Sequence, residues 1–184
     1  LLADAMGHGV AAALHTMHLS SLWSRFYRML ARPAEFAETV NNDLCKMVKD
    51  ESFASAVCGL VDVRNKALCV AAAGGPPLVV FRSAGRVELI DSPGMPVGVM
   101  DDTVYEETIV SLAAGDRLLL FSDGAFEVHN AQNELLGVEG LLRILKGLGY
   151  PATALKSESL EEELLELSNA IRLDDDVTLI DVYF

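Results

Sequence analysis

Three short stretches place aspartates where an apolar run ends or begins. LLAD ends with Asp4, LLLFSDG places Asp123 directly after its apolar run, and DDDVTLIDV begins with Asp174, Asp175 and Asp176. Each aspartate taken alone is more simply a turn residue, because aspartate is rare inside strands and common at their edges. If the last strand runs antiparallel to the strand before Asp123, however, Asp123 and Asp175 meet at one edge of a sheet, where Asp4 can join them.

Carboxylates that converge in this way would form a cation site. Three negative charges close together repel one another strongly unless a cation neutralises them. Oxygen ligands suit hard cations such as magnesium, manganese or calcium. The sequence has no cluster of cysteine and histidine residues of the kind that binds zinc.

Composition narrows the range of functions and partners. The chain has 184 residues, which suits one domain with a substantial core. Its net charge of −13 argues against nucleic acid as a partner, because phosphate binding needs a basic face. Three cysteines without a CxxC motif indicate free thiols in a reducing compartment, and a cytoplasmic location is therefore expected.

The hydrophobic pattern predicts helices that are segregated from strands. Neighbouring strands joined by tight turns favour antiparallel pairing, and the order of elements indicates an α+β layered domain. No GxGxxG or P-loop pattern supports a nucleotide-binding fold. The predicted elements are a strand at 1–4, helices at 10–30 and 33–49, strands at 53–63, 67–73, 78–82, 87–90, 103–112 and 117–122, helices at 138–148 and 159–171, and a strand at 177–184.

Six segments, in the same order, resemble one bacterial family. The segments are ADAMGHGVAAAL, SFASAVCGLVD, AAAGGPPLVVFRSAGRVELI, PGMPVGV, AAGDRLLLFSDGAFEVHN and DDDVTLIDV. They resemble the stage II sporulation protein E-like (SpoIIE-like) phosphatase domain, which belongs to the metal-dependent PPM, or type 2C, protein serine/threonine phosphatases. One departure is AGG at residues 73–75, where the family has AGH.

The resemblance implies a fold and a set of site residues. The fold is a four-layer α-β-β-α sandwich of mainly antiparallel sheets flanked by helix pairs. Residues 1–184 form a single PPM-type domain whose N-terminal strands are missing, since an acidic family segment before LLAD is absent. Asp4 bridges two metal ions, the carbonyl of Ala5 is a further ligand, and Asp123 and Asp175 complete the first metal. Asp176 is a weaker ligand candidate, and Gly124 is the small residue that the crowded site requires.

The same resemblance implies the activity. Two manganese or magnesium ions activate a water molecule that attacks a phosphoserine or phosphothreonine directly, with no phosphoenzyme and no cysteine-based phosphatase loop. The substrate is expected to be a phosphorylated anti-sigma-factor antagonist of STAS type. His8 and His129 are candidates for protonating the leaving group, although His8 is more simply a loop residue that caps the following helix.

Partners and an alternative function follow from the missing segment. An upstream sensor domain is expected in the full-length protein, and an open sheet edge favours pairing with a second copy as a homodimer. The alternative function is a non-catalytic or truncated phosphatase-like module that mediates interaction or regulation. The retention of Asp4, Asp123 and Asp175 argues against this alternative.

Overall fold

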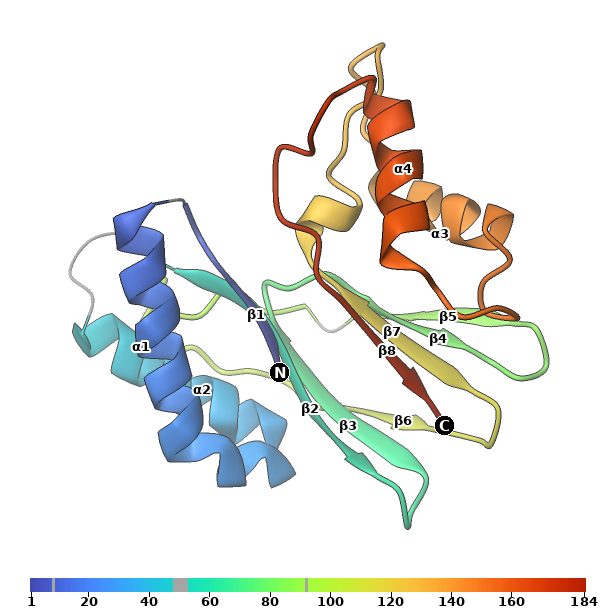
Figure 1. Cartoon of the computed structure of the whole chain (residues 1–184). Helices are drawn as coiled ribbons and strands as arrows, with labels where there is room; N and C mark the ends of the chain where they lie inside the picture. Colours follow the sequence, from blue (N-terminus) through green and yellow to red (C-terminus); the bar gives the residue numbers. More distant parts are fainter. Residues whose placement is uncertain (8, 48–52, 92) are drawn as a thin grey trace.

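The residues that the structure describes form two four-stranded antiparallel sheets that lie face to face, with a pair of helices on each outer face (Figure 1). The computed structural model describes residues 1–7, 9–47, 53–91 and 93–184. This arrangement confirms the predicted α+β class and the four-layer α-β-β-α sandwich.

The first sheet has the strand order β1-β2-β3-β6 and is covered by α1 and α2. Its residues alternate between the two faces, as the period of two along a strand requires. Small side chains such as Ala56 and Ala71 face the helices, whereas Val57 and Val70 face the second sheet. The elements are β1 (Leu2–Ala5), α1 (Val10–Phe26), a 3-10 turn (Tyr27–Ala31), α2 (Pro33–Met47), β2 (Ala54–Asp62), β3 (Ala67–Ala73) and β6 (Thr108–Ser111).

The second sheet has the order β5-β4-β7-β8 and is covered by α3 and α4. Leu141 and Leu145 on α3, and Leu160 and Leu164 on α4, are buried at the i, i+4 spacing that gives a helix one apolar face. The elements are β4 (Leu78–Phe81), β5 (Val87–Ile90), β7 (Arg117–Phe121), α3 (Gly137–Gly147), α4 (Ser157–Ser168) and β8 (Leu179–Tyr183).

The inner faces of the two sheets form the central core. Val57, Val70, Val80 and Leu118 belong to this cluster and are all at most 4% exposed. Because aliphatic side chains from both sheets interlock there, the cluster fixes how the sheets lie relative to one another. The two hairpins β2–β3 and β4–β5, and the antiparallel pairing of β7 with β8, agree with the sequence-based prediction.

The predicted strand at 103–112 is wrong over its first half. Only Thr108–Ser111 forms a strand, because the preceding segment leaves the sheet and binds α2 instead. The backbone N–H of Tyr105 donates to Glu38 at 3.3 Å, and Glu107 accepts from the N–H of Ala34 at 3.2 Å.

The ends of the first two helices also differ from the prediction. The first helix ends at Phe26 and continues as a 3-10 turn to Ala31, whereas the sequence pattern predicted one helix to residue 30. The second ends at Met47, and the predicted end at Lys49 lies outside the described residues. Among the described residues, no helix has the length and apolar character needed to cross a membrane.

Asp116 ties together two turns at the end of the second sheet and supplies a test of the fold. Its carboxylate is 1% exposed and accepts hydrogen bonds from the backbone N–H groups of Ser83 and Ala113, both at 2.9 Å, and from Arg82 at 2.8 Å. Burial opposes ionisation, but these donors hold the pKa of Asp116 below its usual value. We expect Asp116→Asn to lower the free energy of unfolding by about 2–4 kcal/mol. The reason is that the amide NH₂ group, which replaces one carboxylate oxygen, would point its own N–H donors at the N–H donors of the surrounding groups.

Urea unfolding monitored by circular dichroism would measure this loss. Asp91→Asn, at an exposed aspartate, is the matched control and should change the free energy of unfolding by less than about 0.5 kcal/mol. Equal values for the two variants would contradict the role given to Asp116.

Candidate metal centre

Three aspartates from two different sheets meet at one end of the sandwich. Asp4 lies in β1, and Asp175 lies in the loop before β8. Asp123 is the second residue after the end of β7, and Ser122 lies between it and the strand. One carboxylate oxygen from each lies within 4.8 Å of the corresponding oxygens of the other two. The structure therefore brings together the three carboxylates that the sequence singled out, and their role as metal ligands remains a prediction.

Ser122 fixes the two loops that carry Asp123 and Asp175. Its backbone N–H donates to the carbonyl of Thr178 at 3.0 Å, and its hydroxyl accepts from the N–H of Thr178 at 2.9 Å. The same hydroxyl donates to the carbonyl of Asp176 at 3.1 Å. Since this serine is 5% exposed, these bonds are shielded from water and hold the ends of β7 and β8 in one geometry.

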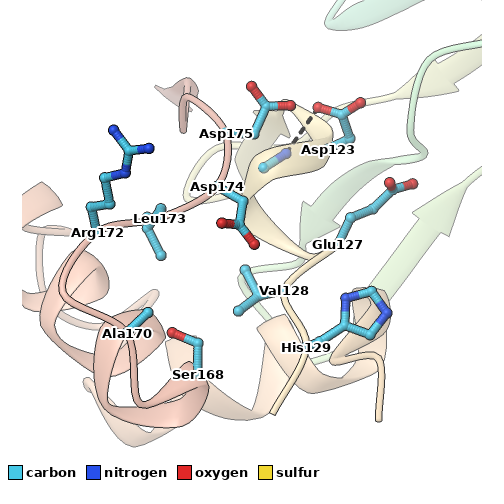
Figure 2. Close-up of a pocket in the computed structure, with 11 residues that line it drawn as sticks. Asp123, Glu127, Val128, His129, Ser168, Ala170, Arg172, Leu173, Asp174 and Asp175 are labelled. Atoms are coloured by element: carbon cyan, nitrogen blue, oxygen red, sulfur yellow. Dashed lines mark hydrogen bonds between the residues drawn. The ribbon is translucent and has the colours of Figure 1, made fainter. Parts of the chain in front are cut away.

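Gly124 is required where these two loops touch. A Cβ at this position would lie 2.4 Å from the carbonyl oxygen of Asp176, which is far inside van der Waals contact. Its N–H donates to the Asp123 carboxylate at 2.9 Å (dashed in Figure 2), and the N–H of Asp176 donates to Asp175 at 2.8 Å. The loops thus orient both carboxylates with backbone donors.

The electrostatics of the cluster suit a cation. Burial, followed by the charges of Asp123, Asp175 and Asp176, raises the pKa of Asp4 to about 6. A raised carboxyl pKa means that the charged form is destabilised where it stands. Three oxygen donors with uncompensated negative charge match the chemistry of magnesium, manganese or calcium, so these residues fit a hard divalent cation.

Two cavities share Asp123 and Asp175 as lining residues. The first, of about 280 Å³, is also lined by Asp4, Ala5 and Ser55, which puts Ala5 beside the three carboxylates.

The second cavity, of about 250 Å³, continues towards the loops after β7 and α4. Figure 2 shows the carboxylates of Asp123 and Asp175 at its upper edge, while Asp174 points down towards the chain at Val128. A substrate that approaches the aspartates therefore has two lined surfaces to contact.

The remaining predicted residues are placed as follows. Asp176 is exposed and lies outside the group of three, although its backbone carbonyl is bound by Ser122. His129 lines the second cavity, and His8 lies outside the described residues. His15 is buried in α1, and burial lowers its pKa.

Cysteine chemistry is disfavoured at the one cysteine with an arginine six residues later, Cys58. Its thiol lies in β2, is 2% exposed, and donates to the carbonyls of Pro33 and Ala71. Burial raises the pKa of this thiol to about 12, so it is protonated at neutral pH and cannot act as a thiolate nucleophile.

Sequence reasoning missed Arg172 and Glu127, which line the second cavity. Glu127 lies four residues after Asp123 in the same loop, and its N–H donates to the carbonyl of Asp123 at 2.8 Å. Arg172 lies three residues before Asp175. Proximity in sequence to a predicted ligand is the signal that would have found both residues.

Comparison with known proteins adds an independent line of evidence. The model of the family described as stage II sporulation protein E (SpoIIE) matches residues 1–184. The phosphoserine phosphatase RsbP of Bacillus subtilis is 25% identical over 131 residues, which cover 69% of this chain and 32% of RsbP. The chain therefore spans about a third of that relative.

Solved structures share the fold. The SiaA-PP2C domain of Pseudomonas aeruginosa superposes with a TM-score of 0.82 at 22% identity, covering 99% of this chain and 73% of that one. RsbX in complex with magnesium gives a TM-score of 0.61 at 15% identity, covering 97% and 77%. At these identities the likeness establishes the fold, which is that of PP2C domains.

Metal binding at the three aspartates can be tested by thermal stability. We expect manganese or magnesium, at about a hundredfold above its Kd, to raise the melting temperature by about 5–10 °C, because the cation binds only the folded state. Asp123→Asn should abolish this increase and raise the melting temperature of the metal-free protein, since it removes one of three repelling charges.

Scanning calorimetry with and without cation measures both effects. Asp101→Asn, which removes an exposed carboxylate outside the cluster, should retain the full cation-dependent increase. Retention of that increase in Asp123→Asn would show that the cations bind elsewhere.

Proposed function

The chain belongs to the stage II sporulation protein E (SpoIIE) family, and we propose that it is a metal-dependent protein phosphatase that hydrolyses phosphoserine or phosphothreonine. The observation that carries this proposal is the convergence of Asp4, Asp123 and Asp175 within 4.8 Å on a PP2C fold. Asp4, Asp175 and Ala5 line one cavity, which supports a site that holds cations beside a substrate.

The charge of the cluster supports two cations rather than one. A single divalent cation leaves the three carboxylates with a residual charge of −1, which repels a phosphate dianion. A second divalent cation reverses the sign to +1 and permits the phosphate to approach. Bound in this way, divalent cations neutralise phosphoryl oxygens and lower the pKa of bound water.

The protein's own residues position the reacting groups. Asp4, Asp123 and Asp175 would hold the cations, and the backbone donors of Gly124 and Asp176 keep two of these carboxylates oriented. His129 lines the adjacent cavity and is the candidate for donating a proton to the leaving serine oxygen. With the Cys58 thiol buried and protonated, direct attack by water is the favoured route.

We propose a STAS-type anti-sigma-factor antagonist as the substrate. RsbP, which the chain resembles over 131 residues, is named a phosphoserine phosphatase, and this supports a phosphorylated protein as the substrate class. An upstream sensor domain and a homodimer are part of the same proposal. The homodimer would form through the open edge of the first sheet at β1. The sensor domain would cover apolar surface on α1, where Val10, Leu14 and Met17 are 52–78% exposed along one side of the helix.

Hydrolysis of p-nitrophenyl phosphate and of a phosphoserine peptide tests the activity. We expect turnover that depends on manganese or magnesium, is lost on chelation by EDTA, and falls at least about a hundredfold in Asp123→Asn and Asp175→Asn, because each removes a cation ligand.

The exposed-site variant Asp101→Asn is the control and should keep full activity. Cation binding to a folded wild-type chain without turnover on either substrate would support the alternative function, a non-catalytic phosphatase-like module.

Arg172 is expected to contribute to recognition of the phosphoprotein. It lines the cavity beside Asp175, and a guanidinium pairs well with phosphate or with an acidic residue that flanks it. Arg172→Gln should raise KM for a phosphoserine peptide about threefold to tenfold and leave kcat within about twofold, since the side chain is exposed. The matched control is Arg64→Gln, at an exposed arginine in the turn between β2 and β3, which should leave KM and kcat unchanged. Steady-state kinetics that show a change confined to kcat in Arg172→Gln would contradict this role.

A further inference from the structure

A cavity of different chemistry, called here the basic cavity, lies between the β4–β5 hairpin and α3. Its volume is about 410 Å³, which is within the range of small-molecule sites. Arg82 and Arg86 approach it from the hairpin, and Arg143 and Lys146 approach it from α3. Val87, Leu142 and Pro151 supply accessible apolar surface, and Phe81 and Tyr150 also line the cavity.

This basic cavity is separate from the aspartate cluster. Phe81 pairs with Arg117 at the start of β7, whereas Asp123 follows the end of that strand. At about 3.3 Å per residue, six residues separate the two places by about 20 Å. The basic cavity shares no lining residue with the cavities beside Asp123.

The charge of the basic cavity is opposite to that of the chain. The protein has a net charge of −13 and 14 basic residues, and four of these line this one cavity without any acidic lining residue. Arg82 is paired with Asp116 at 2.8 Å and with Glu88, which also pairs with Arg86. These two carboxylates offset both guanidinium charges, so the net positive charge of the cavity comes from Arg143 and Lys146. Arg143 and Lys146 are exposed and lie three residues apart on α3, so they share one side of the helix.

The apolar part of the wall is rigid. The rings of Phe81 and Tyr150 are 6% and 3% exposed, and they pack edge to face with centroids 4.8 Å apart. The Tyr150 hydroxyl donates to Asp181 at 2.9 Å, so its hydrogen bond is already made within the protein. The two buried rings therefore hold this wall in place, and its accessible apolar surface comes from Val87, Leu142 and Pro151.

We propose that the basic cavity binds a small amphipathic anion, in which a carboxylate, phosphate or sulfonate is joined to an aromatic or aliphatic body. The basic side chains match the acid group, and the accessible apolar surface of Val87, Leu142 and Pro151 matches the body. An inorganic anion leaves this apolar surface uncovered, and a neutral apolar molecule leaves Arg143 and Lys146 without a counter-charge.

The test uses the fluorescent probe 8-anilinonaphthalene-1-sulfonate with the folded, full chain. We expect saturable one-to-one binding that weakens as salt is raised. N-phenyl-1-naphthylamine has the same rings without the sulfonate, and it should bind at least about tenfold more weakly. Sodium sulfate at equal ionic strength to sodium chloride should compete no better than the chloride.

Variants locate the binding site. The double variant Arg143→Ser with Lys146→Ser should weaken sulfonate binding about tenfold. Arg28→Ser with Lys46→Ser makes the same charge change at exposed residues of the other helix pair and should have no effect. Val87→Glu places an acid at the exposed edge of the cavity, where the native side chain is 45% exposed, and should also weaken binding while the melting temperature is retained.

Three results would overturn the proposal. One is equal affinity of the two double variants for the sulfonate, and another is equal affinity of the native chain for the neutral and charged probes. The third is binding of a ten-residue oligoglutamate peptide at the basic cavity without one-to-one binding of the sulfonate, which would assign the cavity to an acidic protein segment.

Discussion

Electrostatic repulsion among Asp4, Asp123 and Asp175 is the constraint on which the rest of the structure depends. Two ionised carboxylates about 4 Å apart repel by roughly 1–4 kcal/mol, depending on how far water screens them. The three carboxylates form three such repelling pairs. At Asp4, burial destabilises the charged form further, and the pKa of this carboxyl rises to about 6. A fold that contains such a cluster must therefore hold the backbone of the three aspartates in place against this repulsion.

The sandwich supplies those forces from two directions. Asp4 is held by β1, which pairs with β2 in the first sheet, and Asp123 and Asp175 are held by β7 and β8 in the second. The central core between the sheets fixes the distance between these two groups. A shift of β1 by one residue against β2 would turn Asp4 to the opposite face, because side chains alternate along a strand. The cluster thus exists only in one register of the first sheet and one packing of the two sheets.

Much of this arrangement was predictable because it depends on patterns of residues that are close together in the sequence. Alternation and turn residues predicted both hairpins, and Asp123 and Asp175 were placed at one edge by the antiparallel pairing of β7 and β8. The resemblance to one family supplied the four layers and the position of Asp4. The segment before β6 was predicted wrongly, because Tyr105 and Glu107 bind α2 through contacts between residues about 70 positions apart. Alternation of side chains cannot distinguish such a docked segment from a half-buried strand.

The basic cavity could not be predicted from the sequence either, because it also depends on contacts between distant residues. Its presence changes how the net charge of the chain should be interpreted. Arg82 and Lys146 are far apart in the chain and meet only because α3 packs on the second sheet. Acidic residues gather beyond the end of β7, and basic residues gather around its start, where Arg117 also lies. The net charge of −13 is a property of the whole chain and does not give the local charge at either end of β7. The net charge is an average over an end that carries the three aspartates and an end that carries the basic cavity, and a charged ligand that approaches either end responds to the local charge there.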